Sequence, residues 1–297
     1  MSAIDHTGPL TATGNLRRRQ RVDRTMRALA TGAAIFAVAI LVIVIYSIAQ
    51  RGASQLSIGF LTKNPTTTLN GTGGGIKNAI IGSGLIVALA TVIALPLGVL
   101  IAIYLTEFST ARLAAPIRLA LDLLNGLPSI VIGVFVFGLI VLSSGETGFA
   151  GSFALSIIML PLIARNTAES LSLVPKDLRD ASHALGISRW RTTVGIVIPS
   201  ALSGILTSAV LAIARAAGET APLLLTTSLF NPNATSINIF GTSLPNIPLD
   251  IFNLSESGGA ANTAAAWGAA LVLMAFILIG SLSARAMLAR SRRMMSR

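Results

Sequence analysis

The chain has 297 residues, of which 53% are apolar and only 11% are charged, and its mean hydropathy is +0.78. This composition excludes a water-soluble globular protein and predicts a membrane protein that crosses the bilayer several times. The net charge of +11 does not indicate nucleic-acid binding, because the basic residues flank apolar segments instead of forming one face. The chain has no cysteine and two distant histidines, so we expect neither a metal site nor a thiol nucleophile.

Six uncharged segments are long enough to cross a membrane, since a hydrocarbon core of roughly 30 Å takes about 20 helical residues. The sequence therefore predicts an all-α membrane protein with six transmembrane helices. The expected spans lie near residues 28–48, 78–105, 118–145, 149–164, 198–226 and 264–284. The uncharged segment 220–249 is not counted as a further span, because prolines and asparagines interrupt it.

Both ends of the chain are rich in arginine. Six arginines precede residue 28 and five follow residue 284, and basic segments tend to stay on the cytosolic side of a membrane. We therefore expect both termini in the cytosol. The predicted organisation is a basic arm over 1–27, a transmembrane domain over 28–284 and a basic tail over 285–297.

Two segments inside the transmembrane domain combine glycine or proline with polar residues. Residues 70–75 contain four glycines, which predict a flexible turn before the second span. In the third span, Gly126 and Pro128 predict a kink, because Pro128 has no backbone N–H to donate. A kink inside a membrane usually serves a cavity or a hinge, so we assign Gly126 and Pro128 as a helix hinge.

The loop between the fourth and fifth spans, residues 166–197, is polar and basic, which places it in the cytosol. Apolar residues at helical spacing predict two short helices, separated by a turn at Gly186. The small residues Ala181 and Ser182 would let the backbone of a partner approach closely. This pattern favours docking on a cytosolic protein, and a solvated loop whose charges only set the topology stays an alternative.

Charged residues within the spans point to the cargo. Arg215 follows 23 uncharged positions, and an arginine near a bilayer centre costs roughly 2.5–3.5 kcal/mol. Glu219 lies one helical turn further on and would neutralise Arg215, and Arg165 and Glu169 repeat this spacing. A guanidinium matches the oxygens of phosphate or carboxylate, so these four residues predict an oxyanion pathway. A permanent salt bridge at Arg215 and snorkelling of Arg165 stay open, and Asp122 has no assigned role.

The segment 229–262 is long for an outer loop. Its turn signals include Asn231, Pro245 and Pro248, and apolar residues lie between them. We expect an irregular outer loop there, with a surface available to a partner.

The cytosolic loop carries a recognisable motif. Its members are Asp180, Ala181, Ser182, Gly186, Ile196, Ile198 and Pro199. Their order and spacing resemble the EAA signature of ABC importer permeases, with Asp, Ser and Ile in place of Glu, Ala and Leu. In that superfamily the loop fits a cleft on a cytosolic ATPase, so the resemblance implies a coupling role for these residues. The chain has no Gly-x-x-x-x-Gly-Lys-Ser/Thr loop, so we expect another subunit to hydrolyse ATP.

Other segments resemble the PstA family of phosphate-importer permeases. They are residues 73–76, 127–133, 214–224 and 244–252, and the similarity covers roughly residues 70–290. The resemblance implies a six-helix permease of the MetI-like type that translocates inorganic phosphate across the bacterial plasma membrane. It also implies three partners: a homologous permease, PstC, two copies of the ATPase PstB and the external phosphate-binding protein PstS. We expect no cofactor on this chain, since ATP and Mg²⁺ would be used by the ATPase.

Three other functions stay open. A permease of the same superfamily could carry sulfate or molybdate, which competition between ions in uptake would reveal. An ion-coupled secondary transporter would need no ATPase and would be sensitive to a proton ionophore. A membrane scaffold could signal phosphate status without transporting the ion.

Overall fold

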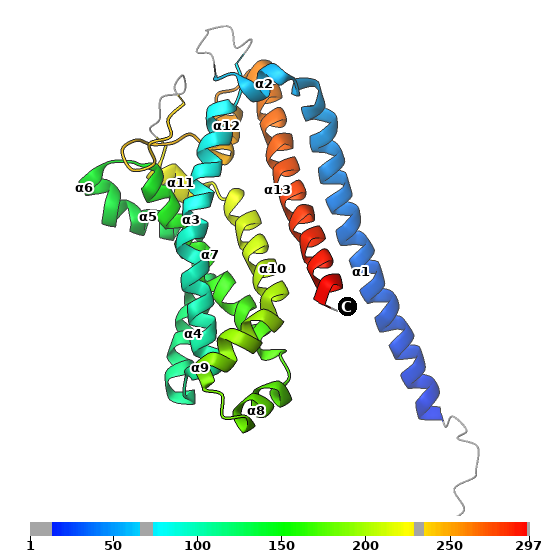
Figure 1. The fold of residues 1–297 in the computed structure, drawn as a ribbon. Coiled ribbons are helices and arrows are strands. Elements are labelled where there is room, and N and C mark those ends of the chain that lie inside the picture. Colours follow the sequence, from blue (N-terminus) through cyan, green and yellow to red (C-terminus); the bar gives the residue numbers. More distant parts are fainter. Residues whose placement is uncertain (1–13, 66–73, 229–234, 296–297) are drawn as a thin grey trace, which may run out of the picture. The chain divides into compact units, whose positions relative to one another are not determined.

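The computed structural model describes residues 14–65, 74–228 and 235–295, and every regular element in these ranges is helical (Figure 1). The chain divides into two compact units, residues 1–50 and 51–297. Residues 70–73 of the turn predicted over 70–75, and the turn signal at Asn231, lie outside the described residues.

Helix α1 is Gly14–Gly52, and its residues 14–50 form the described part of the first unit. Residues 28–50 carry neither charge nor proline, which suits a long uninterrupted helix that meets the length and hydropathy requirements of a membrane span. The helix begins upstream of this segment. The described part of the predicted basic arm is therefore helical and continuous with the first span.

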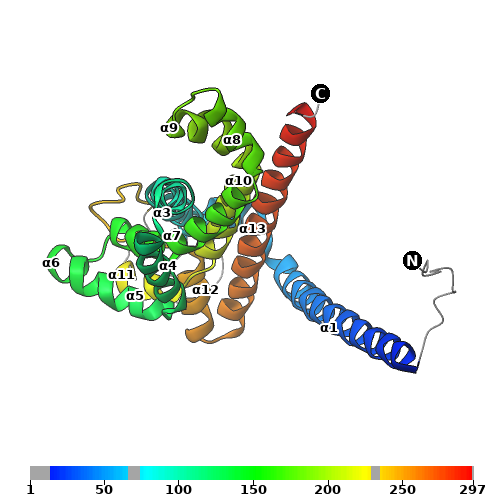
Figure 2. The ribbon, with the colours of Figure 1, turned by 90° about the horizontal axis from the view of Figure 1, so that it is seen from below.

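Four long helices build the second unit. They are α3 (Lys77–Ile103), α7 (Gly148–Ser172), α10 (Ile198–Ala217) and α13 (Ala260–Met295). Helix α3 packs along α7, and α10 packs against both α7 and α13 (Figures 1 and 2). Ile86 of α3 and Leu155 of α7 are fully buried in the shared core. A Cβ atom at Gly98 of α3 would lie only 2.8 Å from Cγ2 of Ile163, so glycine allows the close approach of the two helices.

The predicted third span is a sharply broken helix. Helix α4 (Ala111–Gly126) is followed by α5 (Ser129–Val136), a π-helical turn η3 (Phe137–Val141) and the short α6 (Leu142–Ser144). The axes of the two halves differ by 99°. The break lies where Gly126 and Pro128 predict a kink, because the residue before a proline avoids the helical conformation and Pro128 has no N–H. The described chain thus has five candidate spans, or six when the bent pair counts as one.

The outer part of the second unit differs from the expectation. Helix α10 ends at Ala217, and α11 (Ala221–Thr226) is a separate helix, so the prediction of one span over 198–226 is wrong at its outer end. The segment expected to be an irregular loop contains α12 (Ile247–Glu256). Leu249 is fully buried, and Ile247 and Ile251 pack among apolar residues of α3 and α13. Sequence reading missed this packing because Pro248 looks like a helix breaker, whereas it occupies the first turn of α12, where no N–H is needed.

Short helices form the two ends of the second unit. At one end lie η1 (Ala53–Gln55) and α2 (Ile58–Thr62), close to α12 in Figure 1. At the opposite end lie α8 (Lys176–Ala184) and α9 (Arg189–Thr192). Two further π-helical turns, η2 (Tyr104–Phe108) and η4 (Thr193–Val197), connect this end to α3 and α10. This end carries the predicted cytosolic loop.

Candidate functional site

Helices α8 and α9 form a compact helical hairpin, as the spacing of the sequence predicts. Gly186 ends the turn after α8 with a φ of +75°, a conformation that a residue with a Cβ atom adopts at a cost. The Ser182 and Thr192 hydroxyls lie 2.7 Å apart and are buried, and the N–H of Ile187 donates to the Ser182 carbonyl at 3.2 Å. These contacts fix α9 to α8, so the hairpin can move as one body.

The outer face of this hairpin is apolar and exposed. Leu185 is 80% exposed, and Trp190 is 57% exposed although its ring lies 6.1 Å from that of Phe108. The motif residues Asp180 and Ala181 are exposed as well. Ser182 is different: it was expected to face a partner, but it is buried against Thr192. The prediction for Ser182 is therefore wrong in its contact, because the small side chain serves the interior of the hairpin. Large exposed apolar side chains on a polar helix indicate a surface that a partner covers.

The last two motif residues lie after the hairpin. Ile196 belongs to η4 and is half-buried, and Pro199 is exposed in the first turn of α10. Proline suits that position because the first turn needs no backbone donor. The motif thus runs from α8 through the turn at Gly186, α9 and η4 into α10.

An ion pair that the sequence analysis missed anchors α8 to the rest of the unit. Arg179, next to Asp180, pairs with Glu107 of η2, with Nη2 and Oε1 2.8 Å apart and Nε donating to the same oxygen at 3.2 Å. Arg179 also donates to the carbonyl oxygens of Val174 at 2.6 Å and Leu171 at 2.9 Å. Since 72 residues separate Glu107 from Arg179, no local spacing signals the pair. The only hint was an acidic residue at the edge of an apolar span.

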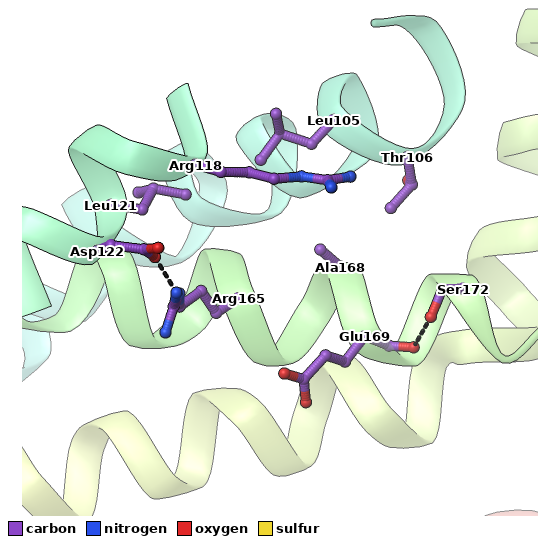
Figure 3. A pocket seen from close by; sticks show the side chains of 9 residues that line it. All are labelled: Leu105, Thr106, Arg118, Leu121, Asp122, Arg165, Ala168, Glu169 and Ser172. Atoms are coloured by element: carbon purple, nitrogen blue, oxygen red, sulfur yellow. Dashed lines mark hydrogen bonds and ion pairs between the residues drawn. The ribbon is translucent and has the colours of Figure 1, made fainter. Parts of the chain in front are cut away.

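Arg165 and Glu169 both line a cavity at this end of the unit, but they do not pair with each other. Arg165 forms an ion pair with Asp122 of α4, and each of these two side chains is 46% exposed. Figure 3 shows Asp122 and Arg165 pointing toward one another, while the Glu169 carboxylate points away from Arg118. The predicted pairing of Arg165 with Glu169 is therefore wrong, because a carboxylate from another helix outcompetes the neighbour on α7.

The cavity has a volume of about 360 Å³ and a mixed charge. Its lining residues are Leu105, Thr106, Arg118, Leu121, Asp122, Arg165, Ala168, Glu169 and Ser172. This volume lies within the range of about 300–1,000 Å³ that small-molecule sites occupy. Arg118 extends along the wall toward Thr106, and no partner for its guanidinium is found among the described residues (Figure 3). Two arginines in one cavity, only one of them paired, form a surface that suits an oxyanion.

Arg215 and Glu219 lie apart from this cavity, at the end of α10. Their Nε and Oε1 atoms are 3.5 Å apart, and their side chains are 48% and 17% exposed. Arg215 lies in the last turn of α10, where a cation also interacts favourably with the free carbonyl end of the helix. In the described part of the chain, Glu219 is the one side chain that pairs with Arg215, through a single long hydrogen bond. Most of its donors therefore stay available.

The break between α4 and α5 lies one helical turn after Asp122. Gly126 and Pro128 are exposed and do not line the cavity, and the structure gives one angle between the two helices. Their role as a moving hinge stays a prediction. Among the described residues, no cluster of three or more histidine, aspartate or glutamate side chains could hold a metal ion.

Comparison with known proteins identifies the family. Residues 94–293 match the family model of the binding-protein-dependent transport system inner membrane component. The chain is also 36% identical, over 93% of its length and 92% of the relative, to the phosphate transport system permease protein PstA of Yersinia pestis. The chain belongs to the PstA family of inner-membrane permeases.

Other relatives and solved structures agree with this membership. The permease is 38% identical to PstA 1 of Mycobacterium tuberculosis strain H37Rv, over 71% of this chain and 68% of that one. Its fold resembles a chain of a bacterial alginate ABC transporter, with a TM-score of 0.62, 15% identity and coverage of 93% and 97%. It also resembles a chain of the MetNI methionine transporter, with a TM-score of 0.57, 15% identity and coverage of 73% and 94%. The predicted MetI-like importer fold is confirmed.

Proposed function

We propose that this permease translocates inorganic phosphate across the bacterial inner membrane, as one subunit of an ATP-driven importer. The two relatives named above, 36% and 38% identical over the aligned residues, are phosphate transport permeases. The observation that carries the proposal within the chain is Arg215, a half-exposed guanidinium held by one 3.5 Å contact to Glu219. Phosphate offers the oxygens that such a planar donor group recognises.

The ion path joins two arginine sites. Phosphate exchanges with Glu219 for the guanidinium of Arg215 and then passes toward the cavity that contains Arg118 and Arg165. At each site a carboxylate neutralises an arginine while no ion is bound, because an unpaired charge away from water is costly. Competition from Glu219 and Asp122 also keeps phosphate binding weak, so that the ion leaves toward the cytosol.

The α8–α9 hairpin receives the driving force. Its exposed apolar face, with Leu185 and Trp190, fits a groove on a cytosolic ATPase, and the chain has no nucleotide-binding loop of its own. We infer that ATP and Mg²⁺ bind to two copies of PstB, that PstC supplies the second permease, and that PstS delivers phosphate from outside. Closure of the ATPases then shifts the permease between inward-open and outward-open states.

Uptake by the complete importer in proteoliposomes tests the proposal. With ATP inside, uptake of radioactive phosphate is measured for Arg215→Ala, Arg215→Lys and Glu219→Gln. We expect the alanine variant to lose uptake and lysine to rescue it only in part, because lysine keeps the charge and lacks the planar fork. Arg27→Ala, which removes an arginine from an exposed ion pair in α1, is the matched control and should transport normally.

Two further measurements separate phosphate transport from its rivals. Excess sulfate or molybdate should not reduce phosphate uptake, and strong competition would indicate a permease for another oxyanion. A proton ionophore should have no effect while ATP is present. Uptake without ATP that collapses with the ionophore would indicate an ion-coupled secondary transporter instead, and full uptake by Arg215→Ala would remove this residue from the pathway.

A further inference from the structure

Three helical elements meet at the guanidinium of Arg179. The arginine belongs to α8, Glu107 to the π-helical turn at the end of α3, and the carbonyl of Leu171 to the last turn of α7. Five hydrogen bonds between 2.6 and 3.4 Å join them, including the one to Val174. The side chains of Arg179 and Glu107 are only 18% and 7% exposed. Each of the three nitrogens of the planar Arg179 guanidinium donates at least one hydrogen bond, so the arginine holds these elements in one fixed geometry.

The same elements form the wall of the arginine-lined cavity. Leu105 and Thr106 precede Glu107 directly, and Ser172 follows Leu171, and all three line the cavity. A displacement of α8 therefore pulls on both the α3 side and the α7 side of the cavity through one residue. Glu107 reaches this position from a π-helical turn, a distortion that often marks a functional site.

The α8–α9 hairpin is also connected to α10. Ser182 binds Thr192 of α9, and α9 continues through η4 into α10, which ends near Arg215. The covalent helical route thus leads toward the arginine at the far end of α10. Contacts to η2 lead to the cavity walls instead. Trp190 and Arg189 of α9 lie against the ring of Phe108, at 6.1 and 5.5 Å, and Arg179 is the residue that hydrogen-bonds to both η2 and the end of α7.

We propose that the Arg179–Glu107 ion pair is the link that transmits movement of the ATPase-bound hairpin to the phosphate cavity. Arg179 and Glu107 are positioning residues: they touch neither the ATPase face nor the cargo. The proposal rests on the proposed function for the origin of the movement and the identity of the cargo. In this proposal the EAA-like motif contacts the ATPase, and the neighbouring Arg179–Glu107 pair couples the hairpin to the cavity.

Cysteine labelling tests this link directly. Thr106→Cys places one thiol in the cavity wall of a chain that otherwise has none. The complete importer is placed in lipid nanodiscs, and labelling by a water-soluble maleimide is timed without nucleotide and with a non-hydrolysable ATP analogue. We expect the nucleotide to change the labelling rate at least about fivefold, a typical coupling strength. Glu107→Gln keeps the size of the side chain and Arg179→Lys keeps the charge but lacks the planar fork, and both should abolish most of this change.

Controls separate transmission from folding. An Asp23→Asn, Arg27→Lys double variant alters an exposed arginine–carboxylate pair and should keep the full response to nucleotide. A merely structural role for Arg179 would reduce the amount of assembled importer and leave the response of each assembled complex unchanged. Ser172→Cys repeats the measurement on the α7 wall.

Two results would overturn the link. One is a full nucleotide response in Glu107→Gln and Arg179→Lys, and the other is a parent chain whose Thr106→Cys thiol does not respond to nucleotide at all. No phosphate is present in this assay. A chain that responds to nucleotide but carries no phosphate would therefore contradict the proposed cargo and leave the link intact.

Discussion

Arg179 and Arg215 are both arginines paired with a glutamate, and their surroundings are opposite. Arg179 is mostly buried and makes five hydrogen bonds to Glu107 and two carbonyl groups. Arg215 is half-exposed and makes one 3.5 Å contact to Glu219, four residues away. These bonds engage four of the five N–H groups of Arg179, whereas Arg215 engages one of its five.

The difference assigns the two arginines to different tasks. A guanidinium with four donors engaged resists exchange, because its displacement would leave the carboxylate of Glu107 buried without its partner. A guanidinium with one weak intramolecular partner exchanges it for a stronger anion at little cost. The first arrangement suits the transmission of movement, and the second suits a passing ion.

The largest expected effect is on stability. Arg179→Ala should lower the free energy of unfolding by about 3–5 kcal/mol, because it leaves Glu107 buried without its partner. Arg215→Ala should lower it by less than about 1 kcal/mol, since its pair is partly solvated. Chemical denaturation of the purified chain in detergent, followed by tryptophan fluorescence, compares the two. Equal losses would remove the distinction between the two arginines.

Asp250 allows a similar comparison between two buried carboxylates, one with a partner and one without in the described part of the chain. It is 9% exposed, nearly as buried as Glu107, but among the described residues no hydrogen bond or ion pair to its carboxyl group is found. It lies in α12, outside the candidate spans, and burial raises the pKa of its carboxyl group from 3.8 to about 7. The folded chain thus keeps a proton there that the unfolded chain releases between these two pH values.

The sign of the pH effect follows from this difference. Below about pH 4 both states hold the proton, so Asp250 does not affect stability; between pH 4 and 7 stability falls by up to about 1.4 kcal/mol per pH unit. Asp250→Asn should remove this fall, so its melting temperature should exceed that of the parent at pH 8 and match it near pH 4. Asp180→Asn, at an exposed carboxylate, is the control. A gain that is the same at both pH values would contradict the raised pKa.

Local patterns account for the parts of the site that were predicted correctly. Helical spacing around Gly186 predicted the α8–α9 hairpin, and Pro128 predicted the break after α4, since both depend on neighbouring residues alone. Spacing was misleading for Arg165, because a residue at i+4 competes with carboxylates from other helices, and Asp122 wins.

Tertiary contacts account for what the sequence did not reveal. Glu107 and Arg179 are 72 residues apart, and only the packing of α3, α7 and α8 brings them together. The burial of Leu249 likewise depends on how the segment before α12 returns to the core, where Thr227 Oγ1 donates to the Leu244 carbonyl at 2.9 Å and accepts from its N–H at 2.8 Å. One sequence read along its length carries no signal for such pairs.

Substitution of Gly186 should have an intermediate effect on stability. It tests the role of the hairpin turn independently of the Arg179–Glu107 pair. A Cβ atom there would meet no atom within 4 Å, so the expected cost comes from the positive φ alone, about 1–2 kcal/mol. Gly186→Val should reduce phosphate uptake per ATP hydrolysed, and Gly186→Asn should reduce it less, because asparagine tolerates this conformation. Both quantities are measured on the reconstituted importer. Equal behaviour of the two variants would show that the turn does not govern coupling.

The smallest expected change in stability is at Asp122. Because Asp122 and Arg165 are each 46% exposed, Asp122→Asn should alter the free energy of unfolding by less than about 1 kcal/mol. The variant frees Arg165 beside the unpaired Arg118, so phosphate should bind the cavity more tightly. Protection of Thr106→Cys from labelling should then need a phosphate concentration up to about fivefold lower, since a factor of five corresponds to about 1 kcal/mol. Arg165→Gln should shift the protection in the opposite direction. If Asp122→Asn leaves the protecting concentration unchanged, the aspartate does not compete with phosphate, and the ion leaves by a route that avoids Arg165.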